Sequence, residues 1–250
     1  MSARAVAQRP LGTLVVFNVL FWSYFLASSA LFFMVIVLLW LTTAPFDRRR
    51  QAMHAVSSFW AAHYLAYAPG AGVVVRGRER LDPRASYVYA SNHASMVDIL
   101  ACMALYLPYR WVSKLENVYV PFIGWALHLD DHVLVRRRDL GSIKRMAKKC
   151  HALLASGHSL FVFPEGTRSP DGRLVPFFSG AFRFAARHRR PLVPVVLHGT
   201  RDVLGKGRLL VSPHPVTVEV LEPIDPAVVD HDWKKLRDLV RSRMEEALAS

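Results

Sequence analysis

Hydrophobic residues are concentrated near the amino terminus of the chain. No charged residue stands between Arg9 and Asp47, and most positions in this stretch are Leu, Val, Phe, Ile or Trp. One helix needs about 20 apolar residues to cross a bilayer, whereas a secretory signal has an apolar core of about 7–15 residues. The pattern therefore predicts a retained membrane anchor within residues 1–50.

The flanks of this segment are basic, with Arg4 and Arg9 before it and three arginines at 48–50 after it. Two full crossings with a turn need a longer segment, so a single span and a re-entrant hairpin both stay open. A hairpin would bend at the polar cluster Ser23, Ser28 and Ser29. Because cytoplasmic flanks carry an excess of Lys and Arg, either arrangement leaves the rest of the chain on the cytoplasmic side.

Residues 51–70 mix small residues with aromatic ones, among them Trp60, Tyr64 and Tyr67. Amphipathic aromatic side chains favour the headgroup level of a bilayer, which predicts an interfacial helix. A helix that packs against a protein core fits the same periodicity.

From residue 71 onward, short runs rich in β-branched and aromatic residues alternate with helical runs. Strands are predicted at 72–76, 86–91, 110–113, 132–136, 159–163, 192–197 and 216–221, and helices near 96–106, 142–155, 180–188 and 233–248. This alternation is typical of a single α/β domain, here 71–250, with a mixed or largely parallel sheet flanked by helices. Pro194 interrupts one apolar run and argues against a central strand there.

The charge balance adds that the surface attracts anions. The chain has 32 Lys and Arg against 19 Asp and Glu, a formal net charge of +13, which suits nucleic acid, acidic lipid or a phosphorylated substrate. Cys102 and Cys150 lack Cys-x-x-Cys spacing and predict neither a zinc site nor a disulfide framework, so a reducing compartment is expected. No histidine spacing indicates a metal site.

Candidate chemistry stands where two predicted strands end. The first, in "SYVYASNHASMVD", leaves His93 on the turn after the strand, and Ser95 and Asp98 match a capping box. The Asp98 carboxylate could equally accept a proton from His93, fix its tautomer and leave the other ring nitrogen as a base. Spacing alone leaves both interpretations open.

The second, "SLFVFPEGTRS", runs into a turn at Pro164. Gly166 permits a tight turn or close approach to a ligand, and the planar fork of Arg168 suits a phosphate. The alternative is a surface turn with a solvated arginine.

Four blocks together resemble the glycerolipid acyltransferase family, specifically bacterial 1-acyl-glycerol-3-phosphate acyltransferases. They are "NHASMVD", "KLENVYVPFIGW", "FPEGTRS" and "VPV", in the family's order. The resemblance implies transfer of an acyl group from acyl-CoA or acyl carrier protein to lysophosphatidic acid at a bacterial inner membrane, without a cofactor or metal. It implies His93 as general base, Asp98 as its orienting carboxylate, and Lys114, Arg137, Glu165, Gly166, Thr167 and Arg168 as substrate-binding residues.

Two departures from the family pattern keep other acceptors open. Val135-Arg136-Arg137 replaces an Ile-Asp-Arg element, so the register of its phosphate arginine is uncertain, and Phe178-Ser179 replaces a basic pair. Other acceptors are glycerol 3-phosphate, another lysophospholipid or a lyso-aminolipid. A membrane-tethered basic module that binds nucleic acid or acidic lipid is the remaining alternative, although no nucleic-acid motif is present.

The chemistry that the resemblance implies suits these residue types. An alcohol is a poor nucleophile and a thioester is already activated, so a base beside the hydroxyl contributes about 10²–10⁴ in rate. Each buried CH₂ is worth about 0.8 kcal/mol, so a long acyl chain stays in the bilayer and the enzyme must work there. Oxyanion donors are expected among backbone N–H groups near the first helix start or Gly166.

Overall fold

The computed structural model describes residues 11–47, 49–66, 72–207 and 210–249. A seven-stranded sheet lies at its centre, in the order β1-β7-β6-β2-β5-β3-β4. Its strands are β1 (Gly72–Arg76), β2 (Val88–Ser91), β3 (Arg110–Lys114), β4 (Val133–Val135), β5 (Leu160–Val162), β6 (Leu192–His198) and β7 (Pro215–Val220). Neighbouring strands are parallel except β6 and β7, which pair antiparallel.

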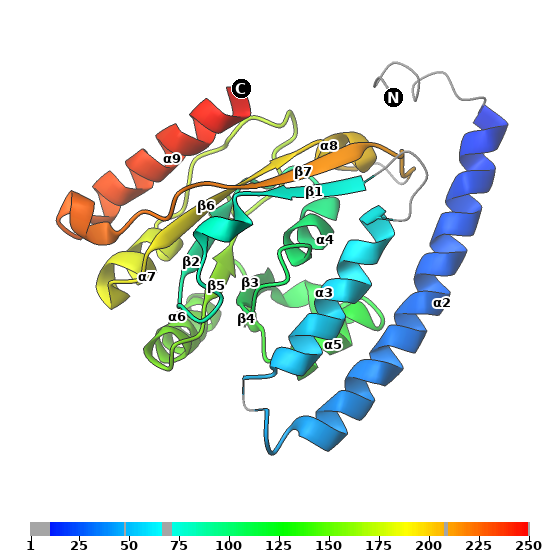
Figure 1. The fold of residues 1–250 in the computed structure, drawn as a ribbon, viewed down its shortest axis with the longest axis horizontal. Coiled ribbons are helices and arrows are strands. Elements are labelled where there is room, and N and C mark those ends of the chain that lie inside the picture. Colours follow the sequence, from blue (N-terminus) through cyan, green and yellow to red (C-terminus); the bar gives the residue numbers. More distant parts are fainter. Residues whose placement is uncertain (1–10, 48, 67–71, 208–209, 250) are drawn as a thin grey trace.

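Helices cover both faces of this sheet (Figure 1). One face carries α6 (Leu140–Ala155), α7 (Gly180–His188) and α9 (Trp233–Ala249), and the other carries α3 (Gln51–Ala66) and α4 (Val97–Met103). The shorter helices are α5 (Ile123–Leu129), α8 (Thr200–Val203) and the 3₁₀ turns η1 (Arg78–Arg80), η2 (Leu115–Tyr119) and η3 (Pro226–Val229). The α/β class with a largely parallel sheet is therefore confirmed.

The hydrophobic clusters on the two faces of the sheet follow from the alternation of side chains along buried strands. In β2, Tyr89 packs with α4 on one face, whereas Val88 packs with α6, α7 and α9 on the other. The seven predicted strands and the four predicted helices of the domain all appear. The prediction was wrong about Pro194, which lies inside the central strand β6, where the missing N–H is tolerated because the ladder with β7 begins only at Val195.

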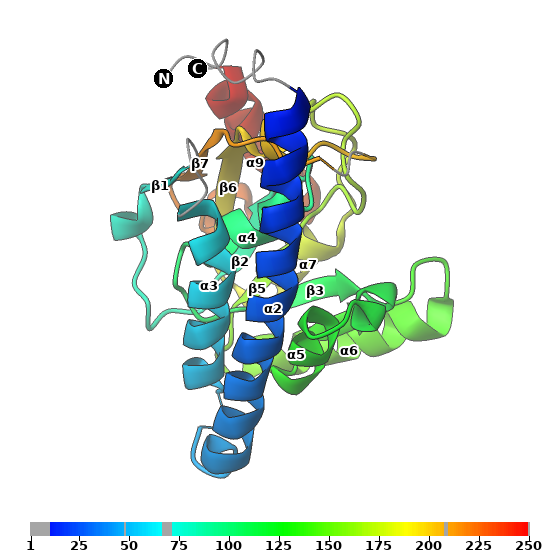
Figure 2. The same ribbon diagram turned by 90° about the vertical axis from the view of Figure 1, so that its right-hand side faces the viewer.

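The apolar amino-terminal segment forms one unbroken helix, α2 (Leu11–Thr43). The serine cluster does not bend it. The Ser28 hydroxyl instead donates a hydrogen bond to the Tyr24 carbonyl at 2.6 Å, and its oxygen lies 2.7 Å from the Tyr64 hydroxyl oxygen of α3. Figure 2 shows α2 and α3 side by side along the domain.

Helix α3 packs like a core helix on this evidence, since eight of its residues, including Trp60 and Tyr64, are buried against α2 and α4. Its predicted continuation through 67–70 lies outside the described residues, as do Arg4, Arg9 and Arg48 of the basic flanks. Helix α5 was not predicted, because seven residues after Pro121 give too little periodicity to separate a helix from a loop.

Candidate active site

His93 lies on the loop that leaves β2, near the middle of the sheet. Asn92 fixes the start of this loop to β6. Its side-chain amide donates to the Leu197 carbonyl at 3.0 Å and its oxygen accepts the Leu197 N–H at 2.8 Å. Both bonds are buried, so the loop leaves the strand in one defined direction.

Asp98 orients the ring of His93. One carboxylate oxygen, Oδ2, lies 2.8 Å from His93 Nδ1 and accepts the backbone N–H groups of Ala94 and Ser95, each at 2.7 Å. Asp98 is fully buried, whereas the His93 side chain is 14% exposed. Because a carboxylate only accepts, Nδ1 carries the proton and Nε2 has a free lone pair, which no described residue engages.

One half of the predicted capping box is present at the same place, because the Ser95 hydroxyl binds the N–H of Val97 and not that of Asp98. Asp98 reaches back to the Ser95 N–H, and the Ser95 hydroxyl accepts the Val97 N–H at 3.0 Å while donating to the Leu204 carbonyl at 2.6 Å. Capping the helix and orienting His93 are therefore performed by the same carboxylate.

The loop after β5 holds His93 from the other side. Glu165 accepts the His93 N–H at 2.7 Å and the Val175 N–H at 3.0 Å, while the Ser169 N–H donates to the His93 carbonyl at 2.7 Å. Burial raises the pKa of Glu165, and the backbone hydrogen bonds work against that rise. The imidazole also stacks on Phe163, with ring centroids 4.1 Å apart.

Gly166 makes the turn of this loop at a φ of 65°. A Cβ at this position would lie 2.6 Å from the Phe178 ring, so the position excludes a side chain on two grounds. Phe178 is itself fixed by its N–H, which donates to the Pro164 carbonyl at 2.8 Å.

An apolar cavity of about 510 Å³ opens beside this loop. Phe21 and Phe25 of α2, Met96 and Val97 at the start of α4, and Arg168 are among its lining residues. Arg168 is half-buried and Thr167 is exposed. The cavity is thus walled on one side by the apolar amino-terminal helix and carries a cation at its edge.

Lys114 is the last residue of β3 and Arg137 follows β4, and the carboxyl ends of these strands share the sheet edge of β2 and β5. Lys114 lies 3.5 Å from Glu116, and both side chains are partly exposed. A backbone hydrogen bond, Lys114 and Arg136 each lower the pKa of Glu116, and burial opposes them. Arg136 and Arg137 are both exposed directly after β4.

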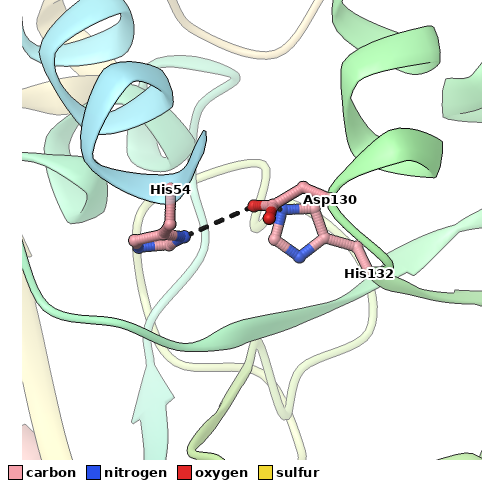
Figure 3. Close-up of side chains that lie close together, drawn as sticks. All are labelled: His54, Asp130 and His132. Carbon is pink, nitrogen blue, oxygen red and sulfur yellow. Dashed lines mark ion pairs between the residues drawn. The ribbon is translucent and has the colours of Figure 1, made fainter. Parts of the chain in front are cut away.

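One group among the described residues has the donor types of a metal site: His54, Asp130 and His132 (Figure 3). His132 Nδ1 accepts the Trp111 N–H at 3.1 Å, so its proton sits on Nε2, which lies 3.2 Å from Asp130. Neither ring nitrogen of His132 is then free to bind an ion. The guanidinium of Arg110 also lies 3.7 Å from Asp130, and its positive charge opposes a cation there. The residues do not fit a metal.

The chain resembles proteins of one family in sequence and in fold. The family model described as acyltransferase matches residues 72–198. A 1-acyl-sn-glycerol-3-phosphate acyltransferase of Chlamydomonas reinhardtii is 38% identical over 82% of this chain and 61% of its own length. A chloroplastic enzyme of the same name from Brassica napus is 35% identical over 86% of this chain and 62% of its own.

A mouse relative, 1-acyl-sn-glycerol-3-phosphate acyltransferase alpha, is 34% identical over 72% of this chain and 65% of its own. The chain thus spans about three fifths of the length of the first curated relatives it matches. The crystal structure of the 1-acyl-sn-glycerophosphate acyltransferase PlsC from Thermotoga maritima superposes with a TM-score of 0.75. It covers 95% of this chain and 98% of that one at 24% identity, which shows a shared fold. On the family match, the chain belongs to the acyltransferase family.

Proposed function

We propose that this protein transfers a fatty acyl group from acyl-CoA or acyl carrier protein to the free sn-2 hydroxyl of 1-acyl-glycerol 3-phosphate, giving phosphatidic acid. The observation that carries the proposal is the contact of 2.8 Å between His93 Nδ1 and the buried Asp98 carboxylate. The names of the relatives supply the acceptor, and the apolar cavity beside Arg168 suits a lipid with an anionic head.

In this mechanism, His93 Nε2 takes the proton of the acceptor hydroxyl as its oxygen attacks the thioester carbonyl carbon. The carbonyl π electrons move to oxygen, giving a tetrahedral oxyanion, while Asp98 stabilises the imidazolium. Collapse of the oxyanion breaks the C–S bond. The leaving thiolate takes the proton from His93, which returns the enzyme to its starting state with no covalent intermediate.

The oxyanion needs N–H donors, and several candidates are already used. The Ala94 and Ser95 amides donate to Asp98, and the Gly166 amide donates to the Phe163 carbonyl at 3.0 Å. No described residue accepts a hydrogen bond from the backbone amides of Thr167 and Arg168. We assign the oxyanion to this pair of amides on the turn beside His93.

The acceptor phosphate binds to Arg168, with Lys114, Arg137 and its neighbour Arg136 as further cations at the same sheet edge. Glu165 acts differently from the other residues of its motif, because its two oxygens accept internal backbone N–H groups and only 2% of the residue is exposed. It is a positioning residue for His93 rather than a ligand of the phosphate. Gly166 and Thr167 shape the turn that presents Arg168.

The anchor α2 lies along the membrane surface with its apolar side in lipid. Along its length it contacts the domain through Asn18, Ser28 and the fully buried Ile36, while large side chains such as Leu20, Leu31 and Leu38 are exposed. This places the mouth of the cavity at the lipid, where the acyl chain enters without crossing water. The relatives come from plants, an alga and a mammal, so the inner membrane of a bacterium stays a prediction.

The test is acyl transfer by purified protein in detergent, with labelled acyl-CoA and a panel of acceptors. Lysophosphatidic acid should react, and His93→Ala should lower kcat by at least about 10³-fold while folding and membrane attachment remain. If glycerol 3-phosphate or another lysolipid reacted while lysophosphatidic acid did not, the proposed acceptor would be wrong. If His93→Ala kept the wild-type kcat, the proposed role of His93 as general base would be wrong.

A further inference from the structure

A second hollow lies away from the candidate active site, in the surface formed by α6, α7 and the start of α9. This groove has a volume of about 720 Å³, and its lining includes Ile143, Met146, His151, Arg183, Phe184 and Trp233. Its floor is apolar, while cations stand on its walls. The proposed reaction uses none of these residues.

The charge of the groove comes from arginine and lysine. Burial lowers the pKa of both His151 and His188, whose ring nitrogens lie 2.8 Å apart, so these two imidazoles contribute little charge at neutral pH. Arg183 lies over the Trp233 ring at 4.3 Å and projects from α7 with Arg187, one turn further along. Arg187 is exposed.

Neither α6 nor α7 contains an acidic residue. Along α6, Lys144 and Lys148 are exposed and directly follow the groove-lining residues Ile143 and Ala147. Lys144, Lys148 and Arg187 form no salt bridge with any residue that the structure describes. The 16 residues of α6 extend about 24 Å, so this basic surface is long enough for a protein helix.

The location of the groove excludes the bilayer as its partner. Helices α6, α7 and α9 lie on the opposite face of the sheet from α2 and α3 (Figures 1 and 2). When α2 lies in lipid, the basic groove faces water. Its anionic partner is therefore soluble.

The groove is connected to the candidate active site by the chain itself. Gly180 begins α7 and lines the groove, and Phe178, two residues earlier, has its ring against the Gly166 turn. A partner seated in the groove can therefore reach the thioester position around this end of α7.

We propose that the groove between α6 and α7 docks acyl carrier protein, the acidic protein form of the acyl donor. This rests on the proposed function. An acidic amphipathic helix of the carrier places apolar side chains on Ile143, Met146 and Phe184 and carboxylates beside Lys148 and Arg187. The thioester is held on a flexible arm, so the carrier binds on the aqueous face while its acyl chain enters the cavity at the lipid. The nucleotide of an acyl-CoA donor, by contrast, would cover only part of this basic surface.

The experiment compares two donors, palmitoyl-acyl carrier protein and palmitoyl-CoA, in initial-rate assays with the full-length protein. Lys148→Glu, Arg187→Glu and the double variant reverse charge beside the groove, and Arg78→Glu is the matched control on η1. For the double variant, the KM for the carrier-bound donor should rise about tenfold or more, with kcat and the KM for palmitoyl-CoA unchanged. For the wild type, added salt should raise only the KM for the carrier-bound donor.

Three results would overturn the proposal. They are a wild type that does not accept the carrier-bound donor, a double variant that uses it normally, and an equal rise in KM for palmitoyl-CoA, which would assign the groove to the nucleotide. Palmitoyl-CoA turnover reports separately on the proposed function. A protein inactive with both donors would contradict that function, whereas activity with palmitoyl-CoA alone contradicts only the docking.

Discussion

At the scale of single residues, one carboxylate oxygen organises the catalytic loop. Asp98 Oδ2 accepts three N–H groups, while Oδ1 is buried without a hydrogen bond to any described residue. Asp98→Asn can keep its oxygen toward the three donors and place the amide at Oδ1, so the loop survives and only the charge is lost. We expect kcat to fall by about 10²-fold or more, because the imidazolium loses its counter-charge.

Circular dichroism and melting temperature serve as the structural control for Asp98→Asn, and Asp98→Ala, which removes the three accepted bonds, should also lower the melting temperature. A charge-neutral Asn variant with wild-type kcat would contradict the role of Asp98 as orienting base partner.

Gly166 is the second residue at which a single change tests the site. Gly166→Ala puts a Cβ 2.6 Å from the Phe178 ring and a side chain at a φ of 65°, a conformation that costs about 1–2 kcal/mol. We expect kcat/KM of Gly166→Ala to fall at least about tenfold. The double variant with Phe178→Ala should recover the part of this loss that comes from the clash with the Phe178 ring, but not the part that comes from the positive φ. Kinetics of the single and double variants measure this coupling. Unchanged kcat/KM in Gly166→Ala would contradict a role of this turn in the active site.

Spacing placed Asp98 about one helical turn from the loop of His93, and the resemblance of the four blocks then selected the contact between the two side chains that the structure shows. Spacing did not predict the hydrogen-bond partners of Glu165. The resemblance implied a substrate-binding role, whereas in the structure its carboxylate accepts the backbone N–H groups of His93 and Val175. Which donors a buried carboxylate meets depends on long-range pairing of two loops, and no local pattern records that pairing.

At the scale of elements, a buried polar cluster joins α3 and α5 to β3 and β4. Burial opposes the charge of Asp130, but His132, His54 and Arg110 surround it and keep its pKa below the usual range for a carboxyl group. Arg110 is also buried and donates to the Arg49 carbonyl at 2.6 Å, which attaches the connection between α2 and α3. Asp130 is thus the counter-charge at this junction.

Asp130→Asn should lower the free energy of unfolding by about 3 kcal/mol at neutral pH, since Arg110 is left buried without a counter-charge. Because the pKa of Asp130 is lower in the folded than in the unfolded state, its charge stabilises the fold above the pKa of the unfolded state. This stabilisation is lost as the pH falls below about 4. The difference in free energy of unfolding between Asp130→Asn and the wild type should therefore become smaller as the pH falls. Urea unfolding at several pH values measures this, with Asp131→Asn as the control, because its pair with Lys149 is half-exposed. A difference that stays constant with pH would contradict this account.

Strand and helix periods predicted the strands and four helices of the α/β domain, since central strands such as β2 and β6 are buried apolar runs and turn residues separate the elements. They could not predict how α2 continues. A serine cluster reads as a possible bend, yet Ser28 and Ser29 face Tyr64 of α3 and remain inside one helix. The serine hydroxyls are satisfied by hydrogen bonds to α3 within a straight helix, and the composition of neither helix predicts this pairing.

At the scale of the whole molecule, the contacts of α2 with the domain favour the proposed in-plane arrangement over a crossing of the bilayer. Asn18 exchanges two buried hydrogen bonds with the backbone of Val211, and Phe33, half the helix further on, contacts Trp125 of α5. The 33 residues of α2 extend about 50 Å, against about 30 Å of hydrocarbon. A crossing helix would have to release these contacts and bury the polar face of the domain in lipid.

Orientation in sealed vesicles distinguishes the two arrangements. Thr13, Leu31 and Thr42 are exposed and share one face of α2, because they stand 18 and 11 residues apart in a helix of 3.6 residues per turn. In the in-plane arrangement, cysteines at these three positions should therefore react alike with a membrane-impermeant maleimide, and none should react from the side opposite the catalytic domain. A spanning helix would make Thr42→Cys reactive from the side of the catalytic domain, Thr13→Cys reactive only from the opposite side, and Leu31→Cys protected until detergent is added. The native Cys102 and Cys150 are buried and give a low background. Reaction of Thr13→Cys only from the opposite side would contradict the in-plane arrangement.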